Sequence, residues 1–127
     1  MTVGEALERA EQLRPGCRVD AQTRIQWLRE TDALLRVKLF DRSATDAFEA
    51  VGADRPWESP VQDDQKLLVP EPFDALYPHL LCAQMDAALG ENDRYVGEQA
   101  QYNALCAELA VWLRQQYPAR RHTRWHW

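Results

Sequence analysis

Residues 67–112 read LLVPEPFDALYPHLLCAQMDAALGENDRYVGEQAQYNALCAELAVW, and this stretch decides the fold. Apolar side chains recur at helical spacing on both sides of a short polar break at residues 90–93. The two stripes consist of Leu76, Tyr77, Leu80, Leu81, Met85, Ala88 and Leu89 before the break and of Tyr95, Tyr102, Cys106, Leu109 and Leu113 after it. Gly90 suits the left-handed position that ends a helix, and Asn92 or Asp93 can accept the first unpaired amides of the next one. The stretch therefore predicts an antiparallel helical hairpin at the centre of the fold.

Two further helices are expected before the hairpin. Thr2 and Glu5 have the spacing of a capping box, and the apolar face that follows ends at Pro15-Gly16. That face consists of Val3, Ala6, Leu7, Ala10 and Leu13. Asp20 is placed to cap a second helix that runs to about Phe40. Its apolar stripe consists of Ile25, Leu28, Leu35 and Leu39. Thr31 and Asp32 interrupt this stripe, so we expect the second helix to change neighbours midway.

Residues 41–72 form the irregular part of the sequence, rich in proline. Thr45–Val51 has room for one or two helical turns, whereas Lys66–Val69 is short and apolar between turn residues, which favours an extended segment. A connection of this length inside a compact domain is usually functional, and Trp57 and other apolar residues give this one something to pack with. We hypothesise that it reaches a neighbouring subunit.

The sequence predicts a mainly α fold with four helices. Pro78 is tolerated in a first helical turn, so the third helix should begin within residues 74–77, and the fourth should run from about Asp93 to Gln116. We expect a single helical domain over residues 1–118, with the irregular connection at 41–72 between the second and third helices. Residues 119–127 have no periodic apolar face and are expected to form an exposed tail.

Composition and charge narrow the class of protein. The chain has 127 residues, 46% of them hydrophobic and 28% charged, which is typical of one globular domain. It has no apolar run long enough to span a bilayer and no pattern of a signal peptide, so we expect neither export nor membrane insertion. Its three cysteines have no repeating spacing, which favours reduced thiols in a cytoplasmic setting. With the three tail arginines set aside, 12 basic and 20 acidic side chains remain, a net charge of −8. An acidic body argues against a protein whose main task is to coat nucleic acid.

The order of motifs along the chain resembles that of one protein family. Val-Pro-x-Pro-Phe-Asp-x-Leu-Tyr is followed by Gln-Met-Asp-x-Ala on a helix, by Gly-Glu-x-Asp-Arg-Tyr, and by a helix with a spaced aromatic residue and a terminal Trp. These residues are Val69, Pro70, Pro72, Phe73, Asp74, Leu76, Tyr77, Gln84, Met85, Asp86, Ala88, Gly90, Glu91, Asp93, Arg94, Tyr95, Tyr102 and Trp112. The combination resembles the head–tail connector (head-completion, or adaptor) proteins of long-tailed bacteriophages and prophages. Residues 1–6 and 25–28 also look like that family, and the resemblance is weakest over residues 41–66 and after Tyr117.

The resemblance implies a structural virion protein of the phage neck and not an enzyme. Such a connector forms a ring, commonly dodecameric, that docks on the portal protein, extends the DNA channel and gives stopper or tail-completion proteins a platform. Genomic DNA passes through the ring without sequence-specific binding, and no membrane is involved. The expected location is the head–tail interface of the virion, and the host cytoplasm during assembly. A chain that is monomeric when free and forms its ring on the portal fits this expectation.

The tail and three residues of the body are the candidate contact sites. The tail residues are Arg120, Arg121, His122, Arg124, Trp125 and Trp127. Trp and Arg are enriched at protein binding hot spots, but they also suit stacking on bases beside phosphates, and chain ends are often disordered. Because connectors of this family dock on the portal through their C-terminal segment, the resemblance favours portal docking. Trp57, Leu67 and Arg94 are the candidate subunit-interface residues, although Arg94 equally suits a surface ion pair within its own chain.

Metal-binding and catalytic patterns are weak in this sequence. His79 and Cys82 lie three residues apart, and His122 and His126 four apart, which are spacings that two zinc ligands on a helix can have. Cys82 also belongs to an apolar stripe, and the sequence has no Cys-x-x-Cys pair, so a core thiol and surface histidines are the favoured interpretation. The sequence has no Gly-rich phosphate loop, nucleophile elbow or Cys/His catalytic pattern. We therefore expect no enzyme activity, no metal and no cofactor.

Two other function classes stay open from the sequence. A small helical DNA-binding regulator would use two of the helices as a helix-turn-helix, but no expected helix carries a basic face. An accessory or toxin–antitoxin helical module would bind one small protein tightly and form no ring.

Overall fold

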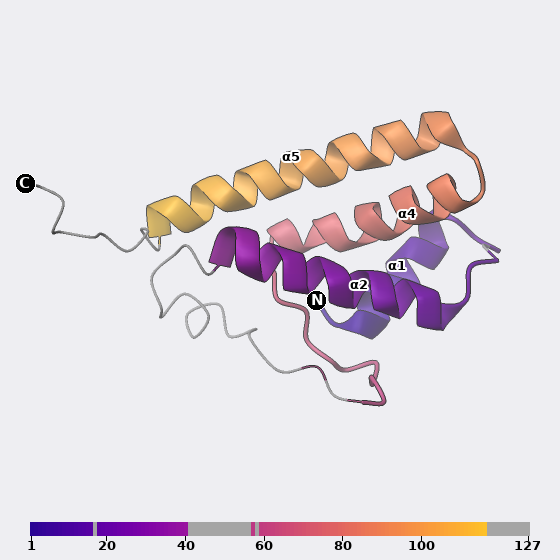
Figure 1. The fold of residues 1–127 in the computed structure, drawn as a ribbon, viewed down its shortest axis with the longest axis horizontal. Helices are drawn as coiled ribbons and strands as arrows, with labels where there is room; N and C mark the ends of the chain where they lie inside the picture. Colours follow the sequence, from indigo (N-terminus) through magenta and orange to yellow (C-terminus); the bar gives the residue numbers. More distant parts are fainter. Residues whose placement is uncertain (17, 41–56, 58, 117–127) are drawn as a thin grey trace, which may run out of the picture.

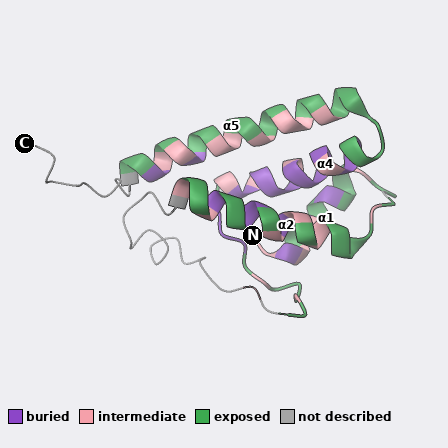
Figure 2. Cartoon of the chain, in the orientation of Figure 1, coloured by how far each residue is buried: buried purple, intermediate pink, exposed green. Residues whose placement is uncertain are grey.

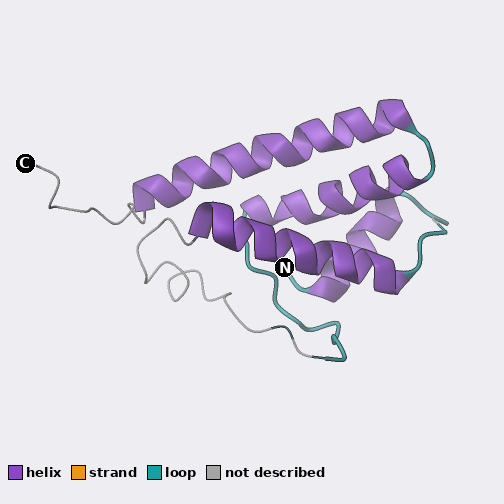
Figure 3. Ribbon diagram, viewed as in Figure 1, coloured by secondary structure: helices purple, strands orange, loops and turns teal. Residues whose placement is uncertain are grey.

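The computed structural model describes residues 1–16, 18–40, 57 and 59–116, and the regular elements in this part of the chain are helices (Figure 3). In chain order they are α1 (Val3–Leu13), α2 (Ala21–Leu35), a π-helical turn η1 (Arg36–Phe40), a 3₁₀ turn η2 (Phe73–Ala75), α4 (Leu76–Ala88) and α5 (Asn92–Gln116). The mainly α fold with four helices is thus confirmed. The helical turn expected at Thr45–Val51 lies outside the described residues.

Helix α4 lies at the centre of the body, antiparallel to the long helix α5 (Figure 1). It also contacts α1 and α2, so α4 is covered by three helices. Nine of its residues are buried, on all sides of the helix and not on one stripe as the sequence predicts (Figure 2). Ala88 and Leu89, expected in that stripe, are exposed, because they lie at the end of α4 beyond the covering helices. A short helix that is apolar all round suits this central place.

The caps predicted at the end of α4 and at the starts of α1 and α2 are confirmed, whereas in the described part of the chain no amide of the first turn of α5 donates to the Asn92 or Asp93 side chain. Gly90 has a φ of 77°, and the amides of Gly90 and Glu91 donate to the carbonyls of Ala87 and Asp86 at 3.2 and 2.8 Å, which ends α4. Thr2 and Glu5 form a capping box at the start of α1, and the Asp20 side chain accepts the Thr23 amide at 2.7 Å at the start of α2.

The predicted face of α1 is correct except at its end. Val3, Ala6 and Ala10 are buried, whereas Leu13 is 47% exposed. Leu13 is the last residue of the helix and borders a surface cavity, so little covers its side chain.

The segment expected to be extended pairs with the N-terminal residues. Lys66 forms an isolated antiparallel bridge with Thr2, and the Leu67 amide donates to the Met1 carbonyl at 3.1 Å. Gly4 allows this close approach, because a Cβ atom there would lie 3.0 Å from the Cβ atom of Asp63. Leu67, Leu68 and Val69 continue into the core. The extended prediction for Lys66–Val69 is therefore confirmed at Lys66 and Leu67, whereas Leu68 and Val69 form a bend.

A buried carboxylate joins α2 to this segment and to α4. Asp32 on α2 is 5% exposed. Its Oδ1 accepts a hydrogen bond from the Tyr77 hydroxyl at 2.6 Å, and its Oδ2 accepts one from the Leu68 amide at 3.0 Å. The Tyr77 oxygen accepts a hydrogen bond from the Val69 amide at 2.9 Å. The polar interruption in the α2 stripe is thus a buried junction of three chain segments.

Burial sets the protonation behaviour of this junction. It raises the pKa of the Asp32 carboxyl to about 6, against the opposing effects of the hydrogen bonds from Tyr77 and Leu68 and the charge of Arg36. Burial also raises the pKa of the Tyr77 hydroxyl, which therefore keeps its proton and donates it to the carboxylate at neutral pH.

Tyr77→Phe should destabilise the protein by about 2–3 kcal/mol, because it leaves the buried Val69 amide without an acceptor and removes a donor from a buried carboxylate. Urea unfolding followed by circular dichroism measures this loss. Tyr95→Phe is the matched control, since Tyr95 is only half-buried, and it should change the unfolding free energy by less than about 0.5 kcal/mol. Equal losses in the two variants would contradict the role given to the Tyr77 hydroxyl.

Asp32→Asn should change how stability depends on pH. Because the folded pKa of about 6 lies above the ordinary value of 3.8, the Asp32 contribution is fully present below about pH 4 and is lost as the pH rises through about 6. The gap between the two pKa values corresponds to roughly 3 kcal/mol. Urea unfolding from pH 4 to pH 7 should therefore show the variant gaining about that much stability relative to the unsubstituted protein. If the unfolding free energies of the variant and the unsubstituted protein change with pH in parallel, Asp32 does not titrate as described.

Candidate functional site

A second buried carboxylate lies where α1 ends against the α4–α5 hairpin. The Asp86 side chain on α4 is 2% exposed. Arg14, the residue that caps α1, reaches it with two hydrogen bonds: Nε donates to Oδ1 at 3.0 Å and Nη2 to Oδ2 at 3.1 Å. This two-point contact is the strong form of an arginine–carboxylate pair. It attaches the end of α1 to α4.

The Arg14 pair extends into a short network that includes α5. Nη2 of Arg14 also donates to Oε1 of Glu98 at 3.0 Å, and Nδ1 of His79 lies 2.6 Å from Oε2 of Glu98. The hydrogen bond with Asp86, more than any other cause, raises the pKa of the Arg14 guanidinium still further above its ordinary value. The guanidinium therefore stays charged and ties α1, α4 and α5 together.

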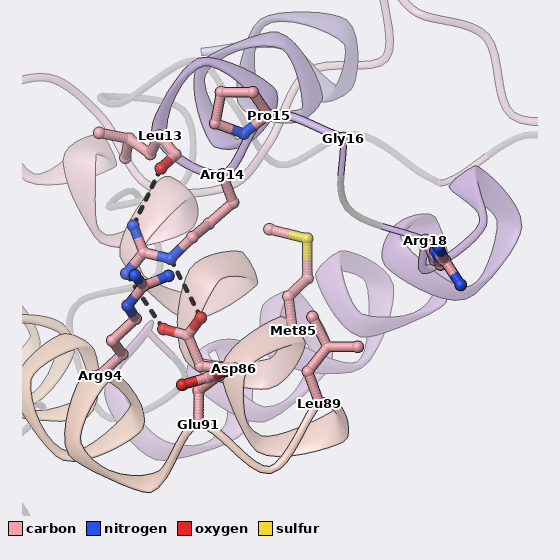
Figure 4. Close-up of a pocket in the computed structure, with 10 residues that line it drawn as sticks. All are labelled: Leu13, Arg14, Pro15, Gly16, Arg18, Met85, Asp86, Leu89, Glu91 and Arg94. Atoms are coloured by element: carbon pink, nitrogen blue, oxygen red, sulfur yellow. Dashed lines mark hydrogen bonds and ion pairs between the residues drawn. The ribbon is translucent and has the colours of Figure 1, made fainter.

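A surface cavity of about 460 Å³ opens beside this network. Its lining comes from the end of α1, the loop after it, the end of α4 and the start of α5 (Figure 4). The lining residues are Leu13, Arg14, Pro15, Gly16, Arg18, Met85, Asp86, Leu89, Glu91 and Arg94. Met85 and Asp86 are buried, whereas Leu13 and Leu89 are 47% and 54% exposed. The cavity thus combines guanidinium groups with exposed apolar side chains, which suits binding of another molecule.

A groove between α2 and α5 is the second hollow surface. Two adjoining cavities of about 280 and 420 Å³ share Leu34, Gln99 and Tyr102 in their lining. Leu80 and Gln84 of α4 line one of them, and Cys106 of α5 lines the other. Burial raises the pKa of both the Tyr102 hydroxyl and the Cys106 thiol, so both groups are uncharged at neutral pH. The groove is therefore mainly apolar, with Glu30 and Lys38 as the charged residues in its described lining.

The predicted interface residues occupy three different settings. Arg94 lines the surface cavity beside the Arg14 network and forms no ion pair with another described residue. The surface ion pair that the sequence left open for Arg94 is therefore not seen among these residues. Trp57 is half-buried, with the Arg29 guanidinium 5.5 Å from its ring centroid. Leu67 is 1% exposed and belongs to the core of its own chain. The candidate portal-docking residues Arg120, Arg121, His122, Arg124, Trp125 and Trp127 lie outside the described residues.

The residues considered as metal ligands are engaged separately. His79 contacts Glu98, whereas Cys82 is fully buried in the core. His122 and His126 lie outside the described residues. Within the described part of the chain, no group of three or more His, Cys, Asp and Glu side chains is placed to hold a metal ion.

No helix in the described part of the chain is long and apolar enough to cross a membrane.

Sequence reasoning did not find the Arg14 network. Asp86 appears in the motif order, but its partner is 72 residues away, and nothing local in the sequence selects Arg14 from the other arginines. The available signal was an acidic residue beside Met85 in an apolar helix, because a buried carboxylate requires a cation or hydrogen-bond donors.

Comparison of the chain with protein-family models, with curated proteins and with solved structures gives no match.

Arg14→Met should destabilise the protein by about 3 kcal/mol, because Asp86 would be left buried without its only described side-chain partner. Thermal unfolding and urea unfolding both report this loss. Arg9→Met, at an exposed position of α1, is the control and should cost less than about 0.5 kcal/mol.

A double variant checks the cause of the Arg14 loss. Combining Arg14→Met with Asp86→Leu removes both charges and should recover most of the lost stability. If the double variant is less stable than Arg14→Met alone, the uncompensated Asp86 charge is not the reason for the loss.

Proposed function

We propose that this chain is a head–tail connector of a long-tailed bacteriophage or prophage. In this role it assembles as a ring on the portal protein, extends the DNA channel and offers a platform to stopper or tail-completion proteins. The single observation that carries the proposal is the ordered set of residues from Val69 to Trp112 that resembles the connector family.

Several of these residues make contacts that hold the helices together. Tyr77 holds the extended entry to the hairpin, and Asp86 holds α1 through Arg14. The Phe73 and Trp112 rings, near opposite ends of the motif order, lie with their centroids 5.6 Å apart. These four motif residues therefore help to hold one helical body together, which supports a signature of fold and assembly and not of catalysis.

Exposed apolar surface supports assembly of several copies. Val96 and Val111 are 65% and 45% exposed, and the helical repeat places them on the same outward side of α5. Leu34 and Val37, at the end of α2 and in η1, are 49% and 62% exposed, and Leu34 lines the groove between α2 and α5. A ring built by one repeated head-to-tail contact needs two different patches on each subunit, and these two surfaces are candidates.

The charge of the chain is compatible with a DNA channel. A net charge of −5 for the whole chain gives a surface that repels the phosphate backbone. A like-charged wall lets DNA slide without sticking, whereas tight binding would hold it in place. Sequence-specific recognition is not part of this role.

Size-exclusion chromatography with light scattering tests the proposal. The full chain should form a stoichiometric ring complex with the portal protein encoded by the same phage or prophage. A chain that ends at Pro118 should lose this complex, because it lacks the Arg- and Trp-rich residues 119–127. A variant with Arg9→Gln keeps the tail and should bind like the unsubstituted chain. If neither the full chain nor the shortened chain binds the portal protein, the connector proposal is wrong.

A further inference from the structure

We propose that the cavity beside Arg14 and Asp86 binds an acidic segment of another protein, with one aliphatic side chain of that segment inserted between Leu13 and Leu89. This inference does not depend on the connector function, because it follows from the charge and shape of the cavity alone.

Two guanidinium groups at the cavity have no partner among the described residues. Arg14 is neutralised by Asp86 and Glu98, but neither Arg18 nor Arg94 forms an ion pair with another residue that the structure describes. Figure 4 shows Arg18 and Arg94 on different sides of the cavity. Both residues are exposed in a chain whose net charge is −5. A segment with two carboxylates can pair with both arginines.

Leu13 and Leu89 are exposed apolar side chains in the lining of the cavity. Leu13 and Leu89 are 47% and 54% exposed, although helix-end leucines commonly pack inward, and the Met85 side chain lies fully buried behind them. Covering these leucines with an aliphatic side chain removes apolar surface from water. The volume of about 460 Å³ is within the range of ligand pockets and is large enough for more than one side chain.

The cavity has a fixed frame. Arg14 is held at four acceptors, the two oxygens of Asp86, Oε1 of Glu98 and the carbonyl of Leu13, by bonds of 3.0 to 3.1 Å. The turn at Gly90 fixes the start of α5, which carries Arg94. Because these walls are already in place, little ordering is needed when a segment binds.

The lining favours a protein segment over nucleic acid. No aromatic side chain is among the lining residues, so the cavity offers no surface on which bases stack. The exposed carboxylate of Glu91 repels a continuous phosphate backbone, whereas a peptide can place its few carboxylates beside the arginines alone.

Titration with short peptides, followed by the backbone amide NMR signals of the full chain, tests the proposal. The probe is an acetylated, amidated peptide of sequence Asp-Glu-Leu-Asp-Glu. Two matched probes replace its Leu by Gly or its four acidic residues by Lys. We expect the acidic leucine peptide to shift the amides of Leu13, Arg14, Gly16, Arg18 and residues 89–94. The glycine peptide should bind several-fold more weakly, and the basic peptide should not bind.

Arginine variants test whether the acidic peptide binds at the cavity. Arg18→Gln combined with Arg94→Gln should weaken binding of the acidic peptide by about tenfold. Both side chains are exposed, and neither forms an ion pair with another described residue, so the amide spectrum should otherwise keep the pattern of the folded protein. Arg9→Gln combined with Arg114→Gln removes the same charge from exposed positions outside the cavity and should leave binding unchanged.

Three results would overturn the inference. The first is that the acidic leucine peptide leaves the amides of Leu13, Arg14, Gly16, Arg18 and residues 89–94 unshifted, or binds the double Arg18 and Arg94 variant equally well. The second is that a ten-nucleotide oligothymidylate shifts the same amides at lower concentration than the peptide, which would assign the cavity to nucleic acid. The third is that these amides shift with protein concentration alone, which would assign the surface to a second copy of the chain.

Discussion

The buried Asp32 carboxylate is the interaction on which the rest of the fold depends. It joins α2 to Tyr77 of α4, 45 residues further along the chain, and to the amide of Leu68. A buried carboxylate is tolerated only where donors surround it, so the extended segment must lie against α2. That segment in turn pairs with Met1 and Thr2, which places the start of α1. One polar group therefore sets the relation between the N-terminal helices and the hairpin.

The Arg14–Asp86 pair does the same work at the other end of the body. Asp32 and Asp86 are both acids inside helices that otherwise bury apolar residues, and each binds groups from a distant segment. Buried charged pairs contribute less to stability than apolar packing of the same volume, but they strongly penalise arrangements that leave a charge unpaired. The two junctions thus select one packing of α1 and α2 on α4.

Local signals in the sequence were sufficient for the helices and their ends. Gly90, Thr2 with Glu5, and Asp20 each act within a few residues, so their roles can be inferred from spacing alone. The burial of Asp32 and its binding to Tyr77 depend on how distant segments meet, which spacing does not encode. For the same reason the sequence places Leu67 among the candidate interface residues, whereas the structure buries it in the core of its own chain. The sequence did not predict the cavity, because its lining residues come from four separate parts of the chain.

The proposed functions place different contacts at opposite ends of α5. The cavity lies at the start of α5. The 25 residues of α5 span about 37 Å before the chain continues towards the tail. The most direct test of the connector account is to remove the coding sequence from the phage or prophage and to examine the particles by electron microscopy. The account predicts DNA-packaged heads and separate tails, restored to whole virions when the chain is supplied. Intact tailed virions in its absence would contradict the account.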